Sequence, residues 1–170
     1  MSSAENFIGY LEELRQNERR WSQARAVLRR SLAFAPGTYP DAYPFVEPRV
    51  GERSGWSREV LYVVAGLYAL KEAHVPQRTL SRAFRETMDR KGSQSLEARF
   101  LTLLDSDYDQ LAERLRRVAI LVEGGFDFVC LQRDLERWFR PDRPVQQNWA
   151  RDFYRSELTE AQTQLKEENS

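Results

Sequence analysis

Segments with helical periodicity, each ended by proline or glycine, run through almost the whole chain of 170 residues. Apolar residues recur at spacings of three, four or seven, which is the period of one helix face. Residues 4–34 carry such a stripe, made of Phe7, Leu11, Leu14, Trp21, Leu28 and Leu32. No useful length of strand-like alternation and no repeat of roughly 20–50 residues is present. The sequence therefore predicts an all-α protein.

Proline and glycine divide the chain into about seven predicted helices. We expect them at residues 4–34, 57–73, 77–91, 95–104, 108–123, 127–140 and from 144 to about 158. The helix at 57–73 is apolar nearly all round, so it should be the buried central helix of the first half. Residues 36–55 hold four prolines and three glycines, which indicates a long irregular connection.

The predicted organisation is two small helical bundles. The N-terminal bundle covers residues 1–104 and includes the Pro-rich connection, and the C-terminal bundle covers 105–165. The polar tail 166–170 is expected to fray.

Charge is balanced overall but unevenly distributed. The chain has 26 basic and 26 acidic residues, and 23 of the 26 basic residues are arginine. Arginine presents a planar fork that matches phosphate, although a GC-rich coding sequence explains the bias equally well. Residues 1–104 carry 16 basic and 12 acidic side chains, a net of +4, whereas residues 105–170 carry 10 and 14, a net of −4. A locally basic face remains compatible with a nucleic-acid partner.

The densest basic cluster lies between Arg15 and Arg30. On one straight helix four of its arginines share an arc of roughly 100° and span roughly 22 Å, enough to follow several phosphates. These four are Arg15, Arg19, Arg29 and Arg30. Arg25 falls on the apolar side with Glu18, so either the helix breaks near Asn17 or these two lie close to the core and pair. Arg25 therefore suits a buried pair or an oriented contact.

Two later helices repeat the pattern at spacings i, i+4, i+7. The first set is Arg78, Arg82 and Arg85, and the second is Arg133, Arg137 and Arg140. Each set projects opposite an apolar face. Two interpretations of these sets are open. Either the arginines bind nucleic acid, or they lie on solvated faces and pair with neighbouring acidic side chains. Aromatic residues do not interleave with these arginines, so the predicted contact is to phosphate, without base reading.

The sequence offers no catalytic constellation. The chain has one histidine, His74, and one cysteine, Cys130. A catalytic Cys/His pair therefore has no second histidine to complete it, and the ligand spacing of a zinc site is absent. Residues 105–109 superficially resemble a calcium loop but lack its glycine and its bidentate glutamate, so we expect these aspartates to cap a helix. His74 is expected to be structural and Cys130 a small buried hydrophobe. We predict no catalytic residue, no metal and no cofactor.

The chain shows no membrane or export signal. No apolar run approaches the roughly 20 residues of a membrane span, and the N-terminus lacks a signal-peptide pattern. A single cysteine fits a reducing compartment. We therefore expect a cytoplasmic protein that makes no membrane contact.

The sequence closely resembles the CasB family, the small subunit of the type I-E CRISPR surveillance complex called Cascade. The resemblance starts at Arg25-Ala26-Val27-Leu28-Arg29-Arg30 and continues through the Pro-rich connection and the apolar helix after it. Further matches are Leu96–Leu104, the segment from Tyr108 to Arg117, Asp134-Leu135, Trp138, Trp149, Phe153 and Tyr154. Where this chain reads Glu18-Arg19-Arg20, the family pattern leads us to expect a break.

The resemblance implies an all-helical, non-catalytic subunit that sits in two copies along the belly of the complex. Its partners would be the CRISPR RNA, the target DNA, the backbone subunit, the large subunit and a second copy of itself. Basic surface residues would hold the heteroduplex and stabilise the displaced DNA strand, and a separate helicase–nuclease would cleave. Guide pairing supplies sequence specificity in such systems, so contacts to the backbone alone are sufficient. The alternative is an assembly protein whose arginines pair with acidic patches of neighbouring subunits.

Overall fold

The computed structural model describes the backbone of residues 1–170 and the side chains of residues 1–155 and 163–170. All regular elements in it are helical, and the one β-type pairing in the described chain is an isolated bridge between His74 and Phe126. The all-α prediction is confirmed. No helix in the described part is long and apolar enough to cross a membrane.

The first predicted helix is two helices, α1 (Ser3–Gln16) and α2 (Glu18–Ser31). Asn17 separates them because its backbone is extended and its side-chain oxygen accepts the N–H of Arg20 at 3.2 Å, which caps α2. A single straight helix over 4–34 is therefore wrong, and the alternative of a break near Asn17 is correct. Arg15 consequently lies on a different helix from the other arginines of its cluster.

The Pro-rich connection is more regular than predicted. It folds into short helical turns, η1 (Pro40–Ala42), α3 (Tyr43–Val46) and η2 (Glu47–Arg49). Each has proline at its first or second position, where the missing N–H costs no hydrogen bond. These turns and the break at Asn17 explain why the chain has more helices than the seven predicted.

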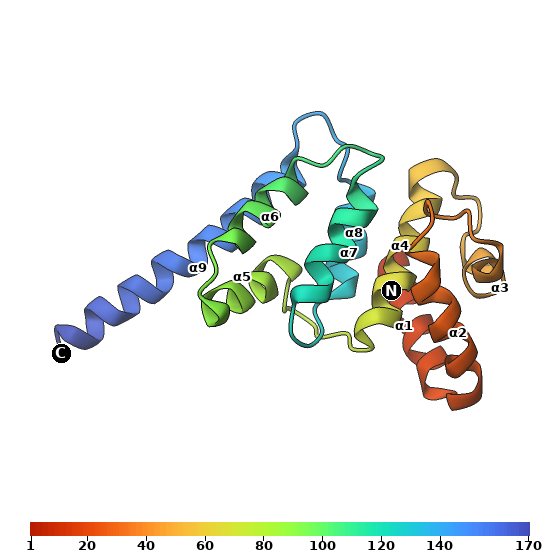
Figure 1. Cartoon of the computed structure of the whole chain (residues 1–170), viewed down its shortest axis with the longest axis horizontal. Helices are drawn as coiled ribbons and strands as arrows, with labels where there is room; N and C mark the ends of the chain where they lie inside the picture. Colours follow the sequence, from red (N-terminus) through yellow and green to blue (C-terminus); the bar gives the residue numbers. More distant parts are fainter.

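Helix α4 (Gly55–Lys71) is the buried centre of the first half, as predicted. Every residue from Val60 to Ala69 is buried, and α4 packs against α2 on one side and against helices of the second half on the other. This arrangement places the C-terminal end of α4 close to α1 and α2 (Figure 1).

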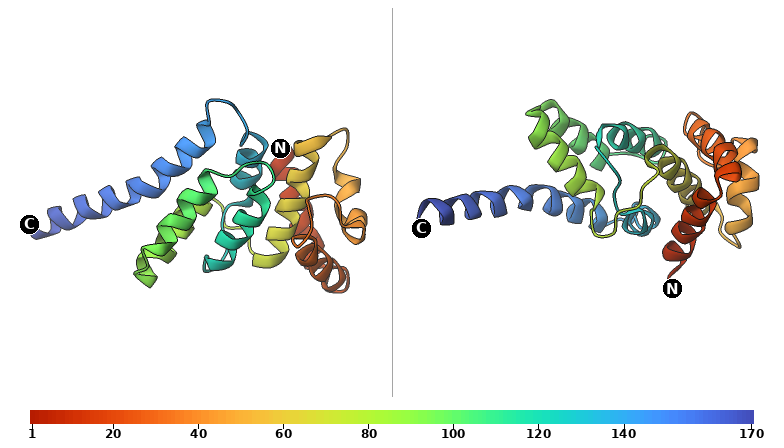
Figure 2. Two further views of the ribbon diagram at one scale, coloured as in Figure 1. Left: turned by 45° about the horizontal axis from the view of Figure 1, so that its top comes forward. Right: turned by 90° about the horizontal axis from the view of Figure 1, so that it is seen from below.

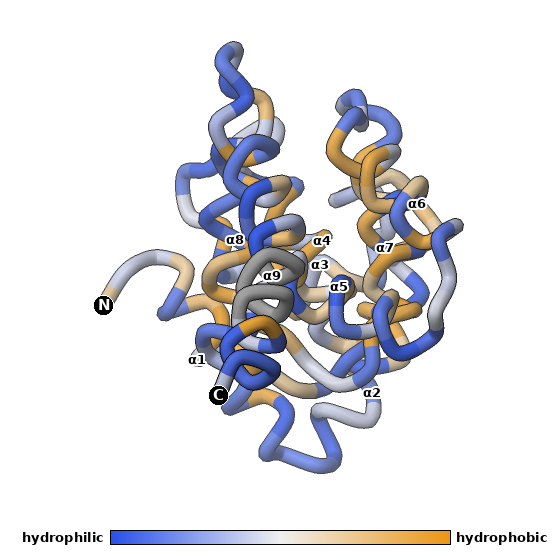
Figure 3. Tube along the Cα trace, turned by 90° about the vertical axis from the view of Figure 1, so that its left-hand side faces the viewer, coloured by the Kyte–Doolittle hydropathy of each residue, from blue (hydrophilic) through white to orange (hydrophobic). Residues whose placement is uncertain are grey.

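After α4 come α5 (Leu80–Lys91), α6 (Ser95–Leu104), α7 (Leu111–Leu121), α8 (Phe128–Glu136) and α9 (Pro144–Glu168). Helix α6 packs on α7 and α5 packs on α9, while α7 and α8 pack against α4. Figure 2 shows α9 extending from the rest of the molecule toward the C-terminus in both views. Figure 3 shows hydrophilic and hydrophobic residues mixed along the helices, as expected when one face of each is buried.

Buried apolar side chains from both halves form one continuous cluster, which runs from Phe7 to Phe153. The division at residue 105 and the fraying of residues 166–170 stay predictions.

Helix α7 begins at Leu111, and its N-cap is Gln110, whose side chain makes no cap hydrogen bond. The expectation that the aspartates of residues 105–109 cap this helix is therefore wrong.

The two halves meet closely at His74 and Gly125. The His74 Nδ1 atom accepts the N–H of Phe128 at 3.1 Å, so this histidine is structural as expected. A Cβ atom built on Gly125 would overlap the carbonyl group of Ala73, so only glycine fits here. Cys130 is half-buried, and burial, followed by its hydrogen bond with Asp127, raises the pKa of the thiol to about 11.

Candidate nucleic-acid interface

Glu72 engages part of the first arginine cluster. It follows α4 in the left-handed conformation, with φ of 55°. Its carboxylate accepts the indole N–H of Trp21 at 2.8 Å and forms ion pairs with Arg25 at 3.3 Å and Arg29 at 3.5 Å. Arg25 is thus paired, but its side chain is 47% exposed, so the pair is not a buried one.

Two arginines of the cluster, Arg15 and Arg29, cap the carbonyl end of α4. Arg29 donates from Nε to the carbonyl oxygen of Ala69 at 2.8 Å and from Nη2 to that of Leu70 at 3.5 Å. Arg15 donates to the carbonyl oxygen of Glu72. The last carbonyls of a helix lack internal partners and carry partial negative charge, so cations are favoured there. Arg15 and Arg29 therefore have a structural role at this helix end.

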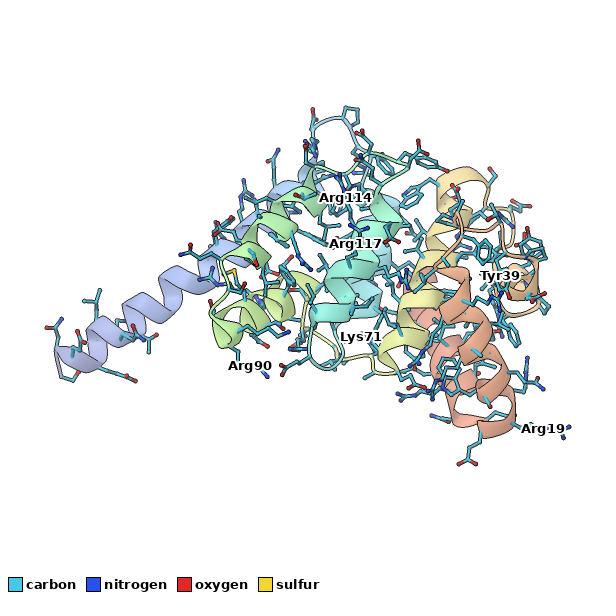
Figure 4. The ribbon with its side chains drawn as sticks, in the orientation of Figure 1. Arg19, Tyr39, Lys71, Arg90, Arg114 and Arg117 are labelled. Carbon is cyan, nitrogen blue, oxygen red and sulfur yellow. The ribbon has the colours of Figure 1, made fainter. Side chains whose placement is uncertain are left out.

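Arg19 and Arg30 remain available to a ligand. Both are exposed, and neither forms an ion pair with any side chain that the structure describes. Arg30 lies over the ring of Tyr39, 6.0 Å from its centroid. Figure 4 shows Arg19 at the outer end of the α1–α2 pair, pointing away from the body.

The predicted set Arg78, Arg82 and Arg85 is used inside the molecule. Arg78 lies in the turn before α5 rather than on it, and it pairs with Glu86 at 2.9 Å. Arg82 pairs with Asp152 at 2.9 Å, which ties α5 to α9. Arg85 is buried, and it donates to Asp89 at 3.0 Å and to the carbonyl oxygen of Phe153 at 3.2 Å. The prediction that these three arginines project from one helix face is wrong, and the alternative that neighbouring acids pair with them is confirmed for Arg78 and Arg85.

The predicted set Arg133, Arg137 and Arg140 divides into one paired and two unpaired arginines among the described side chains. Arg133 reaches from α8 to α1, where it donates to the Ser2 hydroxyl at 2.8 Å and pairs with Glu5 at 3.1 Å. Arg137 and Arg140 lie beyond the end of α8, so the predicted helix 127–140 is too long. Both are exposed and meet no carboxylate at ion-pair distance among the described side chains.

A hollow between α6 and α7 gathers three arginines that were not predicted as site residues. Its volume is about 550 Å³, and its lining is Ala98, Arg99, Thr102, Arg114, Arg117 and Val118. Arg114 donates to the carbonyl oxygen of Thr102 at 3.0 Å, which holds its guanidinium in place. Figure 4 shows Arg114 and Arg117 on the same helix, α7. We call Arg99, Arg114 and Arg117 the α6–α7 arginine groove.

Charge in the α6–α7 arginine groove is mostly positive. Arg117 is 70% exposed and pairs with Glu113 at 3.1 Å, and Arg116, outside the groove, shares the same carboxylate at 3.7 Å. Arg99 is exposed and forms no ion pair within the described part of the chain. A cavity lined by guanidinium groups suits a phosphate, because each guanidinium offers a fork of N–H donors.

The comparisons with known proteins identify the family. The family model described as CRISPR-associated protein Cse2 matches residues 24–154. The chain belongs to the CRISPR-associated Cse2 family. A curated Cse2 protein from Thermus thermophilus is 51% identical over 158 residues, which cover 91% of each chain. The predicted resemblance is thus confirmed.

Solved structures support the same assignment. A Cse2-family crystal structure, also from Thermus thermophilus, matches with a TM-score of 0.85 at 50% identity, covering 91% of this chain and 99% of that one. The crystal structure of CasB from M. ruber matches with a TM-score of 0.78 at 32% identity, covering 96% and 98%. A chain of a CRISPR RNA-guided surveillance complex matches with a TM-score of 0.75 at 26% identity, covering 95% and 96%.

In this Cse2-family chain, the arginines predicted from sequence separate into two groups. Those that hold the fold together are Arg15, Arg25, Arg29, Arg78, Arg82, Arg85 and Arg133. Those left exposed without an ion pair in the described region are Arg19, Arg30, Arg137 and Arg140. A weak signal for the groove does exist in the sequence, since Arg114 and Arg117 are three residues apart on one helix. Its completion by Arg99 depends on how α6 packs on α7.

Proposed function

We propose that this Cse2-family chain is a non-catalytic subunit of an RNA-guided CRISPR surveillance complex and that it holds nucleic-acid backbone with exposed arginines. Its partners would be CRISPR RNA, target DNA, the other Cascade subunits and a second copy of itself. The observation that carries the proposal is the α6–α7 arginine groove, where Arg99, Arg114 and Arg117 line one hollow and only Arg117 is paired with a described carboxylate, that of Glu113. The exposed Arg19, Arg30, Arg137 and Arg140 would add further contacts.

Phosphate recognition follows from the chemistry of the groove. Guanidinium groups pair with phosphate oxygens through charge-assisted hydrogen bonds, and they do so whatever the base sequence. The chain then needs to recognise only the backbone, because a guide RNA supplies sequence specificity by base pairing. Each phosphate contact releases counterions, so binding should weaken as salt increases.

A salt series on the full chain tests the groove. We would measure the affinity for single-stranded and duplex DNA by fluorescence anisotropy between about 50 and 300 mM salt. The variant Arg99→Gln/Arg117→Gln should reduce the slope of log K against log salt by about 1.4 on single strands and 1.8 on duplex. Arg114 is left intact because it also bonds to Thr102.

The matched control removes the same charge from two paired arginines that lie outside the α6–α7 arginine groove. Arg82 pairs with Asp152 and Arg90 with Glu123, so Arg82→Gln/Arg90→Gln should leave the salt slope near the wild-type value. Equal slopes for the groove variant and the control would overturn the groove as the binding site. Absence of any binding by wild type at low salt would overturn direct nucleic-acid contact.

A second candidate function is assembly without nucleic-acid contact. What favours it is the way this chain already uses its arginines, most of which pair with carboxylates or backbone carbonyls. An acidic patch on a neighbouring subunit offers the same chemistry. Failure of the groove variant to join the reconstituted complex, with its DNA affinity unchanged, would favour this alternative.

A further inference from the structure

Two aromatic rings form a parallel stack on the turn that follows α2. The rings of Phe34 and Tyr39 lie 4.8 Å apart between centroids, with 1° between their planes. They are five residues apart in sequence, on a turn that joins α2 to η1. Figure 4 shows Tyr39 at the edge of the N-terminal half, well away from Arg114 and Arg117 on α7.

The turn holds both rings in position. The N–H of Phe34 donates to the carbonyl oxygen of Ser31 at 3.1 Å, and the N–H of Thr38 donates to that of Ala35 at 3.1 Å. The hydroxyl of Tyr39 donates to Asp41 at 2.9 Å. The stack therefore exists before any ligand arrives, so binding would cost little ordering of these side chains.

One ring of the stack is supported and the other is open. Tyr39 packs against the hydrophobic core, whereas Phe34 lies outside it and exposes 45% of its surface. One face of the Phe34 ring is covered by Tyr39, so its opposite face is the one that can receive another flat group. Aromatic pairs prefer such parallel offset or edge-on arrangements.

A positive charge lies beside this stack. The guanidinium of Arg30 lies 6.0 Å from the centroid of the Tyr39 ring, and Arg30 is one helical turn before Phe34. Arg30 forms no ion pair with the described side chains, while the neighbouring carboxylate of Asp41 is engaged by the Tyr39 hydroxyl. A flat apolar surface thus adjoins an available cation.

We propose that the open face of Phe34 stacks on one unpaired base of a single strand, while Arg30 contacts a phosphate beside that base. A nucleotide carries a flat ring and an anionic phosphate, which match this pair of features. Base–aromatic stacking is independent of sequence because every base has a π-face. The inference rests on the proposed function, and it adds a stacking contact to a surface expected to bind phosphate alone.

The test compares normal and abasic single strands of equal length and charge. We would measure the anisotropy of labelled oligothymidylate of about 12 nucleotides and of its abasic counterpart, with the full chain at low salt. Phe34→Leu keeps an apolar side chain over Tyr39 but removes the flat ring. It should weaken binding to oligothymidylate by about five- to tenfold, leave binding to the abasic strand unchanged and leave the salt slope unchanged.

A control variant and a folding measurement make the result specific. Phe34→Trp supplies a larger flat ring and should bind oligothymidylate at least as tightly as wild type. Thermal unfolding of both variants should match wild type, because Phe34 lies outside the core. Arg30→Gln should weaken binding to both strands and lower the salt slope.

Each remaining outcome overturns the inference. If Phe34→Leu binds oligothymidylate as wild type does, there is no stacking site, and the salt series on the groove still decides the proposed function. If Phe34→Leu weakens binding to the abasic strand as much as binding to oligothymidylate, the Phe34 ring does not stack on a base. If wild type binds neither strand, the proposed function fails as well. Lost assembly with unchanged DNA affinity would assign Phe34 to a protein contact instead.

Discussion

Replacement of Glu72 separates the interactions that close the C-terminal end of α4. The Glu72 carboxylate makes two ion pairs with half-exposed arginines and one hydrogen bond with Trp21. Trp21 exposes only 7% of its surface, so an unpaired indole N–H here would be costly. Glu72 also sits at φ of 55°, a conformation that glycine adopts more easily.

Three variants divide these contributions. Glu72→Gln keeps an acceptor for the Trp21 N–H but loses the two ion pairs, each worth about 0.5 kcal/mol when exposed. We therefore expect the free energy of unfolding to fall by about 1 kcal/mol. Glu72→Ala also leaves the Trp21 N–H unpaired, which adds about 1–2 kcal/mol. Glu72→Gly has the same losses as alanine, but it recovers about 1 kcal/mol because glycine favours the left-handed conformation.

Equilibrium urea unfolding followed by far-UV circular dichroism measures the three free energies. We expect Glu72→Ala to be the most destabilising variant, with Glu72→Gln about 1–2 kcal/mol and Glu72→Gly about 1 kcal/mol less destabilising. High salt should remove the difference between wild type and Glu72→Gln, because that difference is made of ion pairs. It should leave the difference between Glu72→Gln and Glu72→Ala, because that difference is a neutral hydrogen bond.

Equal stability of Glu72→Gln and Glu72→Ala would refute the role given to Trp21. A glycine variant no more stable than the alanine variant would refute the backbone argument. The same variants bear on the rival functions, because Glu72→Gln releases Arg25 and Arg29 from a carboxylate. If these arginines lie along the bound backbone, Glu72→Gln should steepen the salt dependence of DNA binding.

Three further predictions concern the junction between the halves. Gly125→Ala should lower the free energy of unfolding, measured in urea, by about 3 kcal/mol, because a Cβ there would overlap Ala73. The control Gly9→Ala, in open space on α1, should be neutral or stabilising. Equal effects of the two substitutions would contradict the close approach of Gly125 to Ala73. Burial raises the pKa of Asp127, but two backbone N–H donors outweigh it and hold that pKa below its usual value. The stability that the lowered pKa adds is present above about pH 4 and is lost as pH falls through that pKa. In a plot of the urea midpoint of unfolding against pH, Asp127→Asn should therefore reduce the fall at acid pH. Parallel curves for wild type and Asp127→Asn would contradict this. Cys130, with its pKa raised to about 11, should react with a maleimide far more slowly than a free thiol at pH 8, and an equal rate would contradict its burial.

Sequence periodicity predicted most helices because proline and glycine mark their ends. The break at Asn17 was harder to assign, since the apolar stripe continues across it and one side-chain cap decides the matter. The prolines of residues 36–55 predict an irregular connection because proline ends helices, and the short helical turns in residues 40–49 do not follow from that pattern. Proline is also favoured at the first helical position, which is how these turns begin.

The role of each arginine was the least predictable part of the candidate site. Spacing on a helix shows which arginines share a face, but it says nothing of partners far away in the sequence. Arg15 bonds to a carbonyl 57 residues away, and Arg85 bonds to one 68 residues away. Arg99 and Arg114 line one hollow from two different helices, so the groove could be found only in the packed fold.

The capping of helix ends by distant cations has a consequence for synthesis on the ribosome. The C-terminal end of α4 is closed by Arg15 and Arg29, which are made earlier, so it can be completed as soon as Glu72 emerges. The C-terminal end of α6 is closed by Arg114 and Arg143, which are made later. The carbonyl of Leu104 therefore stays without its arginine partner until the start of α9 has been translated, and the α6–α7 arginine groove can form only after α7 has emerged.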